Sequence, residues 1–198
     1  MMAGNCRTKA RRFFRDDRGV AALEFALVAP ILILLYLGSI EVTGGLDIDR
    51  KLARAANMVA DLVTQEQGTI AKSRIADIMN IGTATLLPYR RDTPQITVTA
   101  IEVSDDGSAK VAWSRRRVNG VDSRPFTPGS NADLDADLRI PGTAVIRVDT
   151  STAYVPLIAW TMENSVLMSN GTAATGLNLA QTAYGRVRQG GSVACGGC

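Results

Sequence analysis

The sequence contains no histidine at all, and this absence removes several classes of catalytic site. Without histidine a chain of 198 residues has no Ser-His-Asp triad, no Cys-His pair and no histidine-ligated metal. The sequence also lacks a glycine-rich phosphate loop and any cluster of residues at metal-ligand spacing. It therefore predicts a protein that is not an enzyme, with no catalytic residue, no cofactor and no metal.

Cysteine is scarce as well, with three residues in the chain. Cys6 precedes the long apolar run, whereas Cys195 and Cys198 form a Cys-Gly-Gly-Cys sequence near the other end. Without further ligands this pair predicts either a disulfide formed in an oxidising compartment or two free thiols, and we favour the disulfide. A redox enzyme would place such a pair at a helix N-terminus, which a Gly-Gly spacer at the chain end does not favour.

Hydrophobic residues, in contrast, are concentrated in one long run. From Val20 to Ile40 the chain is apolar or small throughout, with Glu24 as its only charge. About 20 such residues span about 30 Å as a helix, which is the thickness of a bilayer core. No small-x-small cleavage site follows the run. We therefore predict a transmembrane helix over residues 20–43 that acts as a signal anchor, with a buried core helix as the alternative.

The residues before this run carry an excess of basic side chains over Asp16 and Asp17, and they form a predicted leader over residues 1–19. The basic residues of the leader are Arg7, Lys9, Arg11, Arg12, Arg15 and Arg18. Positive charge beside a membrane helix holds that end in the cytoplasm, so we expect a single pass with the C-terminal domain in the periplasm. The position of the basic cluster argues against nucleic-acid binding.

Glu24 needs an explanation, because a carboxylate within a bilayer is costly. An acidic residue at mid-depth costs about 2.5 to 3.5 kcal/mol on insertion scales, so an intramembrane acid suggests a function. The alternative is that Glu24, only about one turn inside the run, reaches the cytoplasmic interface.

The stretch RGVAALEFALVAPILILLYLGSIEV resembles the N-terminal segment of TadE-like pseudopilins, which belong to the tight-adherence (Flp) branch of type IV pilus machinery. The resemblance lies in a basic leader, then Gly19, then an apolar helix with Glu24 at its fifth position, followed by Phe25 and Pro30. It is strong over residues 18–60 and weaker beyond. TadG-type proteins share this front end, but the short soluble part favours TadE.

The resemblance implies a processing site between Gly19 and Val20, cut by a prepilin peptidase. Val20 would then carry a new amino group, cationic and close to the membrane. Glu24 and Phe25 would dock the chain to other subunits, with Glu24 paired to a neighbouring subunit's amine, and Pro30 would bend the helix. The implied partners are the peptidase, pilin and pseudopilin helices, and the inner-membrane assembly platform.

The remaining sequence changes its periodicity twice. Apolar residues recur at spacings of three and four over residues 44–82, which predicts an amphipathic helical region. Over residues 83–198 the period becomes two, with an Asp-Gly turn between strands near 96–100 and 109–113, and further strands over 143–157 and 177–189. We predict a type IV pilin-like α+β fold, in which one long N-terminal helix packs on an antiparallel sheet of about four strands.

Three functions are compatible with these patterns. The first is a minor pseudopilin that acts in assembly of a tight-adherence pilus or related secretion apparatus. The second is a signal-anchored periplasmic adhesion or binding domain whose leader is never removed. The third, less favoured, is a membrane-anchored periplasmic thiol protein that uses Cys195 and Cys198.

Overall fold

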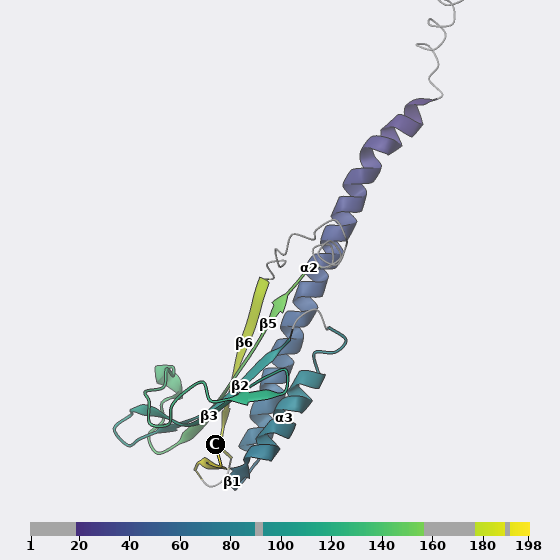
Figure 1. The fold of residues 1–198 in the computed structure, drawn as a ribbon. Coiled ribbons are helices and arrows are strands. Elements are labelled where there is room, and N and C mark those ends of the chain that lie inside the picture. The colour runs from purple at the N-terminus through teal and green to yellow at the C-terminus, as the bar shows by residue number, and fades with distance from the viewer. Residues whose placement is uncertain (1–18, 90–92, 157–176, 189–190) are drawn as a thin grey trace, which may run out of the picture. The chain divides into compact units, whose positions relative to one another are not determined.

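A computed structural model describes residues 19–89, 93–156, 177–188 and 191–198 (Figure 1). The chain divides into two compact units, residues 1–43 and residues 44–198, which are treated separately below. The predicted leader lies outside the described residues except for Gly19, and so does Cys6. The division falls where the sequence predicted the end of the transmembrane segment, although this does not test the predicted domain functions.

The first described element is the helix α2, which runs from Val20 to Thr64 without interruption. Pro30 lies inside it, and so do Gly44 and Gly45. Within the second unit, α2 buries one stripe of side chains at the expected helical spacing: Ile48, Leu52, Ala55, Ala56, Val59, Ala60 and Val63. The predicted amphipathic helix is therefore present.

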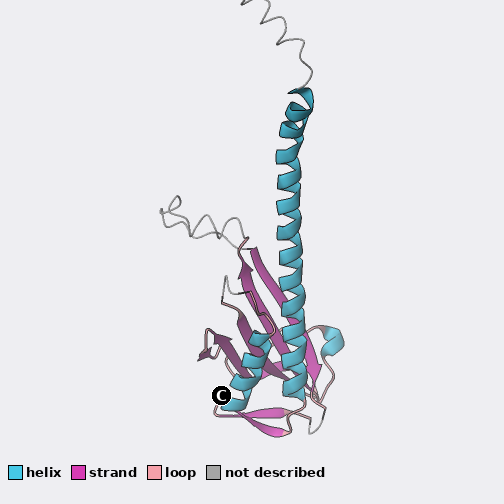
Figure 2. Cartoon of the chain, turned by 90° about the vertical axis from the view of Figure 1, so that its right-hand side faces the viewer, coloured by secondary structure: helices cyan, strands magenta, loops and turns pink. Residues whose placement is uncertain are grey.

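The second unit is built on a five-stranded antiparallel sheet (Figure 2). Its strands are β2 (Gln95–Val103), β3 (Ala109–Val118), β4 (Val121–Ser123), β5 (Ala144–Tyr154) and β6 (Leu177–Arg186), in the order β4-β3-β2-β5-β6. The predicted α+β class is confirmed. Four of these strands match the predicted ones, and β4 is the additional strand.

The turn between β2 and β3 is the predicted Asp-Gly turn. Gly107 has φ of +79°, a conformation that favours glycine, and Asp106 accepts a hydrogen bond from the Ser108 amide at 2.9 Å. Backbone and side-chain hydrogen bonds from Ser108 stabilise the carboxylate and lower the pKa of Asp106. Local sequence therefore determines this hairpin.

The main core lies between the helices and one face of the sheet. The helix α3 (Lys72–Ala84) contributes Ile75, Ile78 and Met79, and alternate residues of β2 supply Ile96, Val98 and Ala100. Gly82 of α3 allows a close approach. A Cβ atom at this position would lie 2.6 Å from Val59 Cγ2 and 2.9 Å from Ile96 Cδ1.

A second, two-stranded sheet was not predicted. The short strands β1 (Gly68–Ala71) and β7 (Val193–Gly196) pair in parallel, which brings the latest described strand of the chain beside the residues that follow α2. Cys195 and Cys198 are joined as a disulfide, with Cα atoms 5.6 Å apart, and both contact the main core. The sequence interval between the partners, more than a hundred residues, explains why the pairing is not visible in a local pattern.

One buried hydrogen bond connects β7 to the larger sheet, and its loss is testable. Trp113 Nε1 donates to the Val193 carbonyl oxygen at 2.6 Å. We expect Trp113→Phe to lower the free energy of unfolding by about 1 to 3 kcal/mol, because the buried Val193 carbonyl oxygen loses this donor. Amide hydrogen exchange should also accelerate in β1 and β7. Tyr184→Phe, at a more exposed ring in β6, is the control and should change stability by less than about 0.5 kcal/mol.

Candidate functional site

The candidate site begins where α2 begins. Gly19 immediately precedes the helix, and Val20 is its first residue. The first amides of any helix lack intrahelical partners, so this end carries partial positive charge. Glu24 lies four residues after Val20 and therefore on the same helix face, one turn along, with its side chain directed toward the helix start.

Glu24 is exposed, and no described residue forms an ion pair or hydrogen bond with its carboxylate. Phe25, which follows it, is exposed as well. The structure therefore exposes a charged and an aromatic side chain at successive positions of the helix. It neither supplies nor excludes the partner that the sequence predicts for Glu24.

The rest of this helical segment is apolar on every side. Its exposed large side chains include Leu23, Leu27, Val28, Ile31, Leu32, Ile33, Leu34, Leu35 and Tyr36. A helix that is apolar all round must be covered by lipid or by other protein. The segment is long and apolar enough to cross a membrane, and none of that stretch is buried in the structure.

The two aliphatic hydroxyl groups near the end of this segment, those of Ser39 and Thr43, are satisfied within the helix. Ser39 Oγ donates to the Tyr36 carbonyl oxygen at 2.7 Å, and Thr43 Oγ1 donates to the Ser39 carbonyl oxygen at 2.8 Å. Because these groups need no water, they do not oppose insertion in a bilayer. Pro30 removes one backbone donor inside the apolar stretch, and its predicted role as a bend stays a prediction.

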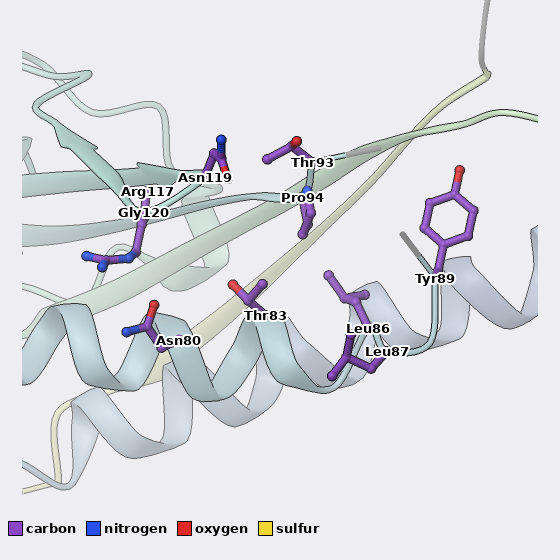
Figure 3. A pocket seen from close by; sticks show the side chains of 10 residues that line it. All are labelled: Asn80, Thr83, Leu86, Leu87, Tyr89, Thr93, Pro94, Arg117, Asn119 and Gly120. Atoms are coloured by element: carbon purple, nitrogen blue, oxygen red, sulfur yellow. The ribbon is translucent and has the colours of Figure 1, made fainter. Parts of the chain in front are cut away.

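The second unit contains a cavity of about 320 Å³ between α3, the segment after it, and the β3–β4 turn (Figure 3). Its lining residues are Asn80, Thr83, Leu86, Leu87, Tyr89, Thr93, Pro94, Arg117, Asn119 and Gly120. The lining contains no carboxylate and no nucleophilic thiol, so it offers hydrogen bonds and apolar contact rather than acid–base chemistry. Within the described ranges no group of three potential metal ligands occurs.

A charged cluster in β3 and β4 was not predicted as a unit. Asp122 accepts hydrogen bonds from Arg115 Nη2 at 3.2 Å and from Arg117 Nη1 at 2.7 Å, and Arg115 is buried. The only available signal was the Asn-Gly dipeptide at 119–120, which folds Asp122 back onto both arginines. Both guanidinium groups therefore share the Asp122 carboxylate, which joins β4 to β3, whereas the buried Arg117 Nε has no hydrogen-bond partner among the described residues.

The disulfide between Cys195 and Cys198 lies at the end of a strand, not at a helix end. Cys195 lies within strand β7, paired with Ile70, rather than at a helix N-terminus where a thiol pKa is lowered. The bonded pair therefore gives no support to a redox enzyme. That the same disulfide forms in the protein after export stays a prediction.

Comparison with known families gives one match. Residues 19–61 match the family model described as TadE-like protein. This range covers the predicted processing site, Glu24, Phe25, Pro30 and the transmembrane segment, and it confirms the resemblance inferred from the sequence. No curated protein and no solved structure matches the chain.

Proposed function

We propose, from the match of residues 19–61 to the TadE-like family of pilus components, that this chain is a minor pseudopilin. Membership of that family implies participation in Tad pilus biogenesis in the broad sense. The finer proposal is that a prepilin peptidase cuts after Gly19 and that the mature chain, beginning at Val20, joins a pilus or related secretion apparatus.

The observation that carries this proposal is the placement of Glu24. It is the single charge in an exposed apolar helical surface, it lies on the face of Val20, and no described group binds it. Once Val20 is a free N-terminus, its amine is a cation beside the membrane. A neighbour's amine paired with Glu24 would neutralise both charges and fix the register between subunits, since a shifted neighbour would leave each charge unpaired.

The proposed arrangement in the cell follows from the same segment. One apolar helix near the N-terminus is consistent with a single-pass anchor. The basic residues before it favour a cytoplasmic N-terminus, and residues 44–198 would then lie in the periplasm. The proposed partners are the prepilin peptidase, the helices of other pilin and pseudopilin subunits, and the inner-membrane assembly platform.

The test is the intact mass and N-terminal sequence of the protein recovered from membranes, with and without a prepilin peptidase. We expect a chain that begins at Val20 only when the peptidase is present. The control is Gly4→Ala, which lies in the leader away from the cut and should leave processing unchanged. If residues 1–19, the predicted leader, remain on the chain in both samples, the proposal is overturned. That result would favour an unprocessed, signal-anchored adhesion or binding domain, because Glu24 would then have no amine to meet.

A further inference from the structure

We propose that the second unit, residues 44–198, contacts the bilayer surface at its end nearest Gly44. Three exposed leucines, Leu46, Leu87 and Leu177, would make this contact. This inference rests on the proposed membrane anchoring of residues 20–43. It adds a second contact with lipid, made by the folded domain itself. The ligand is the interfacial layer of the bilayer, where head groups meet acyl chains.

The position of this end of the domain is set by a contact with α2. The Tyr154 ring lies so close to the helix that a Cβ atom on Gly44 would be 2.8 Å from its hydroxyl oxygen, and Gly45 also faces the ring. Gly44 is the first residue of the second unit, directly after the apolar segment. The part of the sheet that holds Tyr154 is therefore at the level where the chain would leave the membrane.

The three leucines come from three different elements around this point. Leu177 begins β6 and is paired with Tyr154 in the sheet. Leu87 follows α3, and its carbonyl oxygen accepts a hydrogen bond from Lys51 Nζ. Leu46 lies on α2, two residues after Gly44. Their exposed fractions are 53% for Leu46, 50% for Leu87 and 66% for Leu177.

The residues that support the three leucines are packed into a fixed arrangement. These residues form a small separate core of Ile48, Leu52, Leu86 and Tyr154, with Tyr89 and Leu179 packed against it. The Tyr89 and Tyr154 rings stack with centroids 5.9 Å apart, and the Tyr89 hydroxyl donates to the Ala153 carbonyl oxygen at 2.8 Å and accepts from the Val155 amide at 2.9 Å. Such a framework keeps the leucines outward instead of letting them fold inward.

Lipid is the expected partner of the three leucines, because the proposed membrane helix directly precedes Gly44 in the chain. The apolar run of α2 ends at Ile40, about one helical turn before Gly44, so in the proposed anchoring the bilayer surface lies close to the level of Gly44. Two of the carboxylates that follow Gly44 have partners within the second unit, since Asp47 forms an ion pair with Lys51 at 2.9 Å and Asp49 accepts a hydrogen bond from Gln181 Nε2 at 2.7 Å. Apolar side chains at an interface enter about 5 to 10 Å into the boundary of head groups and acyl chains, a depth that a leucine reaches.

The experiment uses the full chain reconstituted in phosphatidylcholine vesicles. Single cysteines carry the fluorophore NBD in a background in which Cys6, Cys195 and Cys198 are serine, after near-UV circular dichroism has shown that this background is folded. The test sites are Leu46→Cys, Leu87→Cys and Leu177→Cys. Val121→Cys in β4 is matched to Leu177 by its 70% exposure but lies at the opposite edge of the sheet. Leu35→Cys reports the anchor.

Nitroxide lipids then measure depth. We expect a nitroxide near the head group to quench the test sites about twofold or more, Val121→Cys to be unaffected, and Leu35→Cys to be quenched by a nitroxide deep in the chains. Test sites that behave like Val121→Cys while Leu35→Cys is quenched would overturn the surface contact alone. A blue-shifted but unquenched signal would also overturn it, since protein would then cover the leucines. If Leu35→Cys is not quenched, the proposed anchoring itself fails.

Discussion

Glu24→Ala is expected to be cleaved after Gly19 like the wild type but to be absent from the assembled apparatus. The proposed cut lies between Gly19 and Val20, and this change leaves the leader and both of these residues in place. The proposed docking, in contrast, would lose the carboxylate that pairs with the neighbour's amine. Removing one partner of a buried ion pair costs about 3 to 5 kcal/mol, which corresponds to a loss of incorporation of about a hundredfold or more.

The measurement compares assembled with membrane-bound protein for each variant, and intact mass confirms that the leader is gone. Glu41→Ala is the matched control, because it removes a glutamate from the same helix beyond the long apolar run. Glu24→Gln separates charge from shape and should fail as Glu24→Ala does. Wild-type incorporation of Glu24→Ala would instead mean that Glu24 only reaches the cytoplasmic interface and has no part in docking.

Leu52→Ala is expected to lower the free energy of unfolding by about 2 to 5 kcal/mol, the usual range for a fully buried leucine. Leu52 has no exposed surface, and it fills the space between α2 and Leu86 and Tyr154. Its carbonyl oxygen also accepts a hydrogen bond from the Thr150 hydroxyl at 3.2 Å, so a shift of the helix would disturb β5. The cavity left by the change would therefore weaken the attachment of α2 to the sheet.

Unfolding of the detergent-solubilised full chain by urea, followed by near-UV circular dichroism, measures this effect. Leu46→Ala is the control on the same helix. Its side chain is exposed, so in detergent it should change stability by less than about 0.5 kcal/mol. Equal midpoints for the two variants would show that the packing of α2 on the sheet contributes little to stability.

The sequence predicts those parts of the fold that a short stretch of residues determines by itself. The stripe from Ile48 to Val63 repeats at helical spacing, and the strands on either side of Gly107 alternate around an Asp-Gly turn. Strand β4 was missed because three residues show no period. Its Asn-Gly turn was nevertheless a signal, since Asn119 and Gly120 both adopt positive φ, as a two-residue hairpin requires.

The candidate site likewise has a part that a local motif predicts and a part that it does not. Gly19, Glu24 and Phe25 could be predicted because the motif is contiguous, and the family match covers it. The partner of Glu24 is different, since in the proposed assembly the amine that donates to its carboxylate belongs to another molecule and no fold of one chain contains it. The pairing of β1 with β7 was out of reach for a related reason, because contacts between distant short segments leave no period in either of them.

The position of β7 also bears on the order in which the domain is made. Residues 193–196 emerge from the ribosome after every other described element and, in the proposed topology, would also cross the membrane after them. Val193 is nevertheless buried in the main core and accepts the Trp113 hydrogen bond. Until they arrive, Trp113 Nε1 has no carbonyl to bind and one side of the core is open to water. In the proposed topology, completion of the domain would therefore wait for the translocation of β7, and a chain interrupted before this strand would present an unfinished core to periplasmic proteases.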